Sequence, residues 1–199
     1  MRQPSGCLIV VVGPSGAGKD SVLQASQRQL SHTQDVRFVQ RVITREAADG
    51  YENHKALDHE AFIAREQAGD FCLTWQAHDL YYGVPLCVAD WVNDGYTVIL
   101  NGSRRALPSI QSVFPELRVV HLVVDDEILA QRLAARGRES ATQIKQRLSR
   151  QAPVSAREKL DIVIHNNDSL ADTVATFVAF IEGIRLGKVH RQRSSAQTS

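Results

Sequence analysis

The sequence predicts an α/β fold in which a mostly parallel sheet carries helices on both faces. Short apolar runs rich in Val and Ile alternate along the chain with longer segments of helical period. Strands that are covered on both faces are apolar throughout, and their alternation with helices is typical of parallel sheets. In addition, a glycine-rich turn joins the first apolar run to the first helical segment, as in a strand–turn–helix unit.

The predicted elements follow one another in a regular order. The first strand is the uninterrupted apolar run Cys7–Val12, and the helix Lys19–Leu30 follows its glycine-rich turn. The other apolar runs predict strands at Val36–Ile43, Phe71–Trp75, Thr97–Leu100, Val119–Val124 and Ile162–Ile164. The segments of helical period predict helices at Asp58–Gln67, Leu86–Asn93, Arg104–Val113, Asp126–Arg136, Ala141–Gln151 and Leu170–Ile184. The polar residues 188–199 have almost nothing to bury, so we expect them to be disordered.

The composition is that of an ordinary globular protein. The chain has 199 residues, of which 43% are hydrophobic and 23% charged, and a net charge of +1. This length suits one domain, which we expect at residues 1–187. The small net charge argues against nucleic-acid binding, and no apolar stretch is long enough to cross a membrane. Cys7, Cys72 and Cys87 are widely spaced among apolar residues and predict buried thiols. With no secretory signal, we expect a cytoplasmic protein.

The turn after the first strand has the pattern of a phosphate-binding loop, G-x-x-x-x-G-K. It consists of Gly13, Pro14, Ser15, Gly16, Ala17, Gly18 and Lys19. Glycines let backbone N–H groups converge on a phosphate, and the following helix adds the partial positive charge of its N-terminus. Lys19 is expected to neutralise the β- and γ-phosphate oxygens during transfer. A glycine-rich turn without function is the alternative, but the strand, lysine and helix in register favour a kinase that binds ATP.

The residue after the loop lysine departs from the usual pattern. Ser or Thr normally stands there and binds Mg²⁺, whereas this chain has Asp20 followed by Ser21. A carboxylate is a good ligand for Mg²⁺ or for a water bound to it, so we expect Asp20 and Ser21 to belong to an ATP·Mg²⁺ site. The alternative is that Asp20 only complements the helix N-terminus. The strand Thr97–Leu100 is followed by Asn101 and no acid. Asp125, after the strand Val119–Val124, could serve instead or could cap the next helix; otherwise Asp20 would supply the missing charge.

The order of further motifs resembles that of guanylate kinases along the chain to about residue 184. After the loop come Ile43-Thr44-Arg45, Tyr81-Tyr82-Gly83, Arg132-Leu133 with Arg136-Gly137-Arg138, and Asp161–Asn166. The resemblance implies a P-loop kinase fold with an acceptor-binding insertion at roughly 36–95 and a lid at roughly 132–150. It also implies that Arg136 and Arg147 of the lid act on the transferring phosphoryl group, and that Asn166 lies near the adenine. A solvated helix face is the alternative for any one of these arginines.

The chain departs from guanylate kinases where that family reads the base. The three places that accept hydrogen bonds from guanine there hold Thr74, Val84 and the acid-free segment Asn101–Ser103 here. A base edge with N–H groups needs acceptors, and each polar group left unpaired costs ~1–3 kcal/mol. The base-reading half of such a site is therefore absent.

The phosphate-binding half is kept and extended. By the same resemblance, Arg45 and Tyr82 match the ligands of the acceptor phosphate, and His54 stands near a further one. Arg41 replaces a small hydroxyl residue, and Arg104 follows the segment where the base is bound in that family. Added cations without base readers fit an acceptor that carries a second phosphate.

Together with Glu52-Asn53-His54 and Asn101–Arg104, these motifs resemble the ribose 1,5-bisphosphate phosphokinases of phosphonate utilisation. The resemblance implies that ATP phosphorylates ribose 1,5-bisphosphate to 5-phosphoribosyl 1-diphosphate. Glu52 is assigned to the sugar hydroxyls, with an exposed turn as the alternative. His121 shows no ligand spacing and is interpreted as structural or superficial. A nucleoside monophosphate kinase and a non-catalytic binding module are the rival interpretations, and the oligomeric state is not readable.

Overall fold

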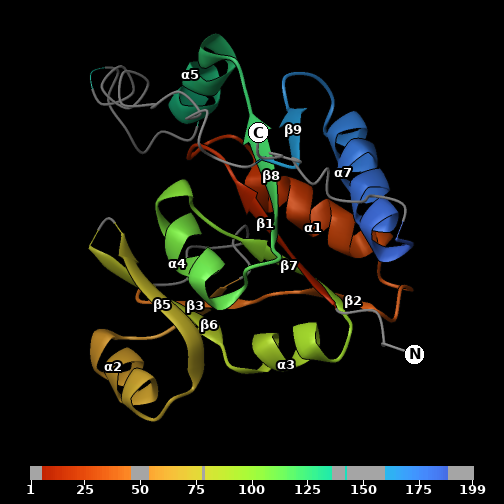
Figure 1. Ribbon diagram of the computed structural model, residues 1–199. Coiled ribbons are helices and arrows are strands. Elements are labelled where there is room, and N and C mark those ends of the chain that lie inside the picture. Colours follow the sequence, from red (N-terminus) through yellow and green to blue (C-terminus); the bar gives the residue numbers. More distant parts are fainter. Residues whose placement is uncertain (1–5, 46–53, 78, 136–141, 143–159, 188–199) are drawn as a thin grey trace, which may run out of the picture.

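The computed structural model describes residues 6–45, 54–77, 79–135, 142 and 160–187. Its centre is a five-stranded sheet with the strand order β2-β7-β1-β8-β9 (Figure 1). The strands are β1 (Cys7–Val12), β2 (Val36–Phe38), β7 (Thr97–Asn101), β8 (Arg118–Val123) and β9 (Ile162–His165). All of their pairings are parallel, so the carboxyl ends of these strands lie at the same edge of the sheet.

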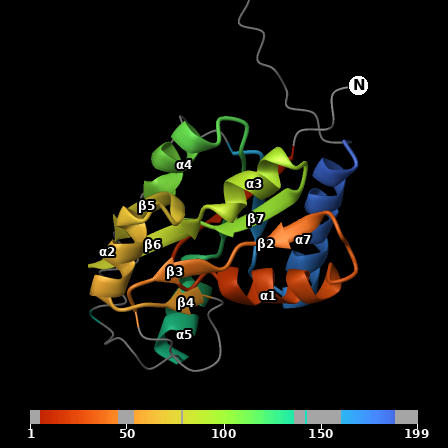
Figure 2. The same cartoon turned by 90° about the horizontal axis from the view of Figure 1, so that it is seen from below.

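Helices cover both faces of this main sheet because the side chains of β1 alternate between two apolar clusters. Ile9 and Val11 belong to the cluster on the side of α1 and α7, whereas Leu8 and Val10 belong to the cluster on the side of α3 and α4. The two pairs of helices lie on opposite sides of the sheet (Figure 2). The helices along the main sheet are α1 (Lys19–Gln29), α3 (Cys87–Asn93), α4 (Leu107–Val113), α5 (Asp126–Ala135) and α7 (Leu170–Arg185).

A second sheet of four strands lies beside the first, with the order β4-β3-β6-β5. Strand β3 runs parallel to β4 and antiparallel to β6, which is also antiparallel to β5. Helix α2 packs on the second sheet, where Phe62 of the helix stacks on Phe71 with ring centroids 5.0 Å apart. These elements are β3 (Arg41–Ile43), β4 (His54–Ala56), α2 (His59–Gln67), β5 (Phe71–Ala77) and β6 (Leu80–Pro85).

The predicted fold class is confirmed, but the interpretation of Val36–Ile43 as one strand is wrong. The backbone N–H of Val39 still donates to the Ile99 carbonyl of the main sheet at 2.9 Å. The chain then leaves that sheet and continues as β3 in the second one. Strands β4 and β6 are absent from the sequence prediction, because β4 has only three residues and β6 carries a motif that resembles a loop. The predicted helix Arg104–Val113 begins as a 3₁₀ turn, η1 (Arg104–Ala106).

Other expectations have mixed outcomes. The predicted helix Ala141–Gln151, apart from residue 142, and residues 188–199 lie outside the described residues. In the described part of the chain, no helix is long and apolar enough to cross a membrane. None of the three cysteines forms a disulfide within the described residues; Cys7 and Cys72 are only partly buried and Cys87 is exposed at the start of α3, so the expectation of buried thiols is wrong for Cys87 and met only in part for the other two.

Candidate active site

The phosphate loop connects β1 to α1 and folds back on its own lysine. Lys19, the first residue of α1, donates from Nζ to the carbonyl oxygens of Gly13 at 2.8 Å and Pro14 at 2.9 Å. The backbone N–H of Ala17 donates to the Pro14 carbonyl at 3.2 Å, which closes the turn. The loop therefore holds an ammonium group at the N-terminus of α1, where the helix dipole also favours an anion.

The loop is braced from the end of β9. Asn166 is buried, and its Nδ2 donates to the Ala17 carbonyl at 2.7 Å, while its Oδ1 accepts from the Thr173 hydroxyl at 3.0 Å. Gly18 has a φ of 88°, and a Cβ atom there would lie 2.5 Å from Nδ2 of Asn166. Only glycine fits this close approach without displacing the brace. The carboxamide that the resemblance assigns to the adenine is thus bonded within the protein.

Asp20 is tied to the end of β7. Nδ2 of Asn101, the last residue of β7, donates to Oδ1 of Asp20 at 2.7 Å. The Oδ1 atom of Asn101 is buried and has no hydrogen-bond partner within the described ranges. A cavity of about 40 Å³ beside this pair is bounded further by Gln24, Phe38 and Ile99. A carboxylate and an amide oxygen therefore lie close together, one residue from the loop lysine.

The second sheet brings three of the predicted acceptor ligands onto one face. Arg41 on β3 pairs with His54 on β4, and Ile43 on β3 pairs with Tyr82 on β6. Residues paired across a sheet share a face, as do residues two apart along a strand. The guanidinium carbon of Arg41 lies 5.6 Å from the centroid of the Tyr82 ring, within the range of a cation–π contact. His54, Arg41 and Tyr82 thus form one row across the sheet.

Arg45 is placed beside this row by Thr44. The backbone N–H of Thr44 donates to the Tyr81 carbonyl at 3.1 Å, and its hydroxyl oxygen accepts from the Tyr81 N–H at 2.9 Å. These two bonds join the Ile-Thr-Arg motif to the Tyr-Tyr-Gly motif, although 37 positions separate the two residues. Arg45, which follows Thr44, is therefore placed close to Tyr82, which follows Tyr81.

Electrostatic interactions link the row to the phosphate loop. Burial lowers the pKa of Arg41, whereas Asp20 on α1 and Tyr82 raise it and Arg45 lowers it. Burial also lowers the pKa of His54, and the cations Arg45 and Arg41 lower it further. His54 is therefore neutral near pH 7, with one donor and one acceptor nitrogen. The cluster has the character of an anion site that faces α1.

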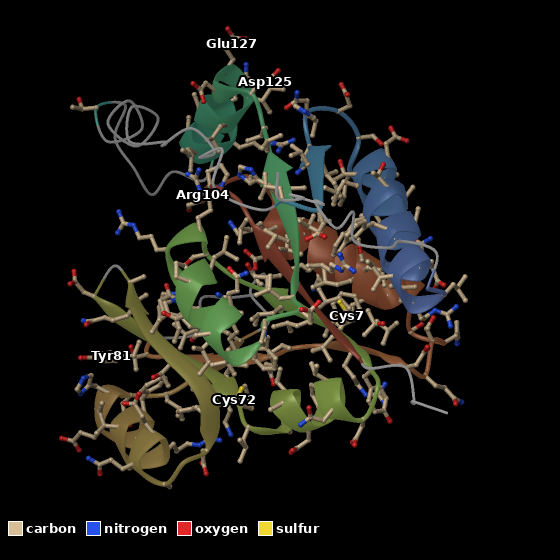
Figure 3. The ribbon with its side chains drawn as sticks, in the orientation of Figure 1. Cys7, Cys72, Tyr81, Arg104, Asp125 and Glu127 are labelled. Atoms are coloured by element: carbon tan, nitrogen blue, oxygen red, sulfur yellow. The ribbon has the colours of Figure 1, made fainter. Side chains whose placement is uncertain are left out.

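A buried histidine lies on the other side of the loop. His121 on β8 is 3% exposed and pairs in register with Val12, the last residue before the loop. Burial lowers its pKa, and Arg104 and Lys19 lower it further, so both cations lie near the ring. Its Nδ1 has no hydrogen-bond partner among the described residues. Arg104 lies at the end of α4 that is nearer to α5 (Figure 3).

Sequence reasoning did not single out two residues of this region. His121 is not superficial, and the signal for it was a histidine inside an apolar strand beside the loop strand. Arg132 on α5 carries a guanidinium nitrogen 4.0 Å from the place of a Cβ atom on Gly18, and this nitrogen is buried without a partner in the described chain. The sequence analysis placed Arg132 in the lid but assigned the action on the transferring phosphoryl group to Arg136 and Arg147. Arg136, Arg147 and Glu52 lie outside the described residues.

The side chain of Thr74, which the resemblance places at the first base-reading position, is bonded within the protein. Thr74 turns towards α2, where its hydroxyl donates to Oε1 of Glu66 at 2.5 Å. Leu73 is the residue opposite Val84, and both side chains are buried. Because side chains alternate along a strand, Leu73 shares the face of Tyr82 and Thr74 does not. Leu73 and Val84 therefore belong to the buried apolar cluster that they share with side chains of the main sheet.

Comparison with known proteins supports a kinase. The family described as guanylate kinase matches residues 5–183. Proteins named ribose 1,5-bisphosphate phosphokinase PhnN from Rhizobium etli and Agrobacterium fabrum are each 41% identical to the chain. The first alignment covers 93% of this chain and 93% of the relative, and the second covers 88% and 96%. A relative of the same name from Pseudomonas paraeruginosa is also 41% identical, over 91% of this chain and 98% of its own length.

Solved structures agree on the fold. Guanylate kinase from Anaplasma phagocytophilum superposes with a TM-score of 0.68 and 18% identity, covering 94% of this chain and 89% of that one. A gluconokinase from Sinorhizobium meliloti superposes with a TM-score of 0.52 and 17% identity, covering 94% and 97%. At these identities the likeness establishes the fold alone. The substrate has to be inferred from the residues of the site.

Proposed function

The chain belongs to the guanylate kinase family, and we propose that it is a ribose 1,5-bisphosphate phosphokinase. It transfers the γ-phosphate of ATP to ribose 1,5-bisphosphate and releases ADP and 5-phosphoribosyl 1-diphosphate, in the utilisation of phosphonates. The observation that carries this proposal is the division of the second sheet. Arg41, His54 and Tyr82 form a row suited to phosphate, whereas Leu73 and Val84 are buried and offer a base edge no hydrogen-bond partner.

The chemistry needs little beyond positioning and charge. A phosphate oxygen of the acceptor attacks the γ-phosphorus while the bond to the ADP oxygen breaks. The acceptor phosphate is already largely deprotonated near pH 7, so no general base is required. Lys19 and the loop N–H groups stabilise the charge on the donor, and Arg41, Arg45 and Tyr82 hold the acceptor in line with it. Arg104 adds a cation on the side of His121.

Residues outside or at the edge of this arrangement complete the proposal. We assign Arg136 and Arg147 to a lid that covers the transferring group, together with Arg132. Glu52 binds the sugar hydroxyls. Asn166 acts by fixing the carbonyl of Ala17, and so the shape of the phosphate loop. We propose that the reaction takes place in the cytoplasm, because its donor is ATP.

The pair formed by Asp20 and Asn101 fits Mg²⁺. Magnesium prefers oxygen ligands and is commonly held by one or two carboxylates together with substrate phosphates. The buried Oδ1 of Asn101, which has no partner in the described part of the chain, suits a metal-bound water. When bound, the ion would neutralise charge on the donor phosphates. Asp20 would hold it, with Ser21 beside it, while Asn101 fixes the carboxylate by its 2.7 Å hydrogen bond.

The test is a steady-state comparison of acceptors at one ATP and magnesium concentration. Replacing several base partners by apolar groups forfeits ~1–3 kcal/mol each, and charge-assisted bonds to a second phosphate add ~1.5–3 kcal/mol each. We expect kcat/KM for ribose 1,5-bisphosphate to exceed that for GMP at least ~10³-fold. Equal or better turnover of GMP would make the protein a divergent nucleoside monophosphate kinase. Absence of turnover with any acceptor would favour a non-catalytic binding module.

A further inference from the structure

Thr173 joins helix α7 to the residue that braces the phosphate loop. It is buried in the first turn of α7, the helix that lies beside α1 (Figure 1). Its hydroxyl donates to Oδ1 of Asn166 at 3.0 Å and also lies 3.3 Å from the carbonyl oxygen of Ser169. The bond to Asn166 is the shorter of the two, and it links α7 to the side chain that holds the loop.

The carboxamide of Asn166 has one orientation that satisfies both of its neighbours. The Ala17 carbonyl can only accept a hydrogen bond, so it needs the Nδ2 group, which donates to it at 2.7 Å. The Oδ1 atom then faces Thr173, whose hydroxyl can donate. If the amide were turned over, its oxygen would face the Ala17 oxygen, and two acceptors repel each other. Because Asn166 is buried, the hydroxyl of Thr173 is needed to satisfy Oδ1 in the orientation that the loop requires.

The peptide unit between Ala17 and Gly18 is the part of the loop that Asn166 holds. In a planar trans peptide the C=O and the N–H point in opposite directions, so a carbonyl directed at Asn166 turns the N–H of Gly18 away from it. Gly18 has a φ of 88°, and glycine adopts either sign of φ readily, so the loop sequence alone does not fix this peptide unit. The hydrogen bond from Asn166 therefore sets the direction of an N–H group at the N-terminus of α1, where such groups bind phosphate.

We propose that Thr173 is a positioning residue of the donor site, and that it sets the affinity of the phosphate loop for ATP through Asn166. The inference rests on the proposed function, in which the loop binds the phosphates of ATP. Thr173 acts on the donor through two consecutive hydrogen bonds, and neither of them involves the second sheet, where the acceptor binds. Because loop N–H groups bind the donor both before and during transfer, the effect falls on ATP binding more than on kcat.

The test is a calorimetric titration with adenylyl imidodiphosphate, an ATP analogue that resists transfer, in the presence of Mg²⁺ and without acceptor. Thr173→Val removes the hydroxyl and keeps the branched shape, so we expect the analogue to bind ~10-fold more weakly, as for the loss of one hydrogen bond. Thr173→Ser keeps a hydroxyl and should bind the analogue like the wild type. The matched control is Thr176→Val, about one turn further along α7, whose exposed hydroxyl donates to the Asp172 carbonyl at 3.0 Å. This variant should leave the affinity unchanged.

Steady-state kinetics separates a positioning role from a loss of stability. Thr173→Val should raise KM for ATP ~10-fold and leave KM for ribose 1,5-bisphosphate unchanged. A less stable fold would lower the activity without this difference between the two substrates. Thermal unfolding checks that the variants are folded. If Thr173→Val does not fold, Thr173→Ala, which also lacks the hydroxyl, is titrated in its place with the same expectation.

Because the titration contains no acceptor, the inference and the proposed function can fail separately. A wild-type protein that binds the analogue but does not phosphorylate ribose 1,5-bisphosphate refutes the proposed function, while a loss of affinity in Thr173→Val still supports the role of Thr173. Unchanged affinity in a folded variant that lacks the hydroxyl refutes that role. An equal loss of affinity in Thr173→Ser or in Thr176→Val refutes it as well.

Discussion

Arg41 offers the sharpest single test of the acceptor site, and the substitution is Arg41→Met. Methionine keeps much of the buried volume and removes the guanidinium that lies over Tyr82. The change takes away a cation that the structure aims at the same region as Arg45 and His54. It leaves the phosphate loop and Lys19 untouched.

The expected effect is the sum of the interactions that are lost with the guanidinium and the desolvation cost that is removed with it. A charge-assisted bond to phosphate contributes ~1.5–3 kcal/mol, and the cation–π contact with Tyr82 adds ~0.5–1 kcal/mol. In the opposite direction, the desolvation cost of a buried cation disappears. This change affects the stability of the fold more than substrate binding. The specificity constant for ribose 1,5-bisphosphate should therefore fall ~10- to 100-fold, with the rise in KM larger than the fall in kcat. Arg41→Lys keeps the charge without the planar fork and should lie in between.

The assay is a steady-state titration of ribose 1,5-bisphosphate at saturating ATP, with Arg65→Met as the matched control. Arg65 also stacks on a ring of the second sheet, 5.2 Å from Phe71, but on the side of α2, so its loss should leave KM unchanged. A second readout is the pKa of His54, which should rise towards its ordinary value in Arg41→Met, as measured by NMR titration. An unchanged KM in Arg41→Met, or an equal rise in Arg65→Met, would refute this account of the acceptor site.

Three further predictions concern the donor site and the buried His121. Lys19→Ala should lower kcat at least ~10²-fold with the fold intact, because a cation aimed at transition-state charge is lost; near-normal turnover would sink the assignment of the loop. Asp20→Ala should raise the Mg²⁺ concentration for half-maximal rate more than the KM for the acceptor, and an unchanged magnesium dependence would leave Asp20 as a helix-end charge. Burial lowers the pKa of His121, so the unfolded chain takes up a proton first as pH falls below about 6.5, and the free energy of unfolding declines by up to ~1.4 kcal/mol per pH unit. Urea unfolding of His121→Gln should show a shallower decline between pH 7.5 and 5.5, whereas the exposed His32→Gln should follow the wild type.

The local part of the site could be predicted from the sequence. The apolar strand β1, the glycine turn and Lys19 are consecutive, so each constrains its neighbours and the pattern is readable without knowledge of the fold. The starts of α1, α2, α3, α5 and α7 were likewise predicted to within one residue. The row formed by Arg41, His54 and Tyr82 could be suggested only through a family resemblance, because it depends on strand pairings between distant segments.

Thr74 illustrates why the remainder could not be predicted from the sequence. In a strand, a shift of one residue moves a side chain to the opposite face of the sheet. In the structure, Thr74 donates to Glu66 of α2, whereas the neighbouring Leu73 shares the face of Tyr82. The hydrogen bond between Asp20 and Asn101 spans 81 positions and depends on the pairing of β1 with β7. No local pattern encodes such a contact.

The division of labour in the second sheet explains how one family can change its acceptor and keep its chemistry. Strands β3 and β4 carry the cationic and imidazole groups, whereas β5 and β6 carry the aromatic and apolar wall formed by Trp75, Leu73 and Val84. Tyr82 connects the two halves, since it pairs with Ile43 on β3 and with Trp75 on β5. We therefore expect substitutions on β5 to affect this wall more than the phosphate ligands on β3 and β4. The donor loop follows a strand of the main sheet, so substitutions on the second sheet do not change its geometry. The acceptor can therefore change while the direction of attack on the γ-phosphate stays the same.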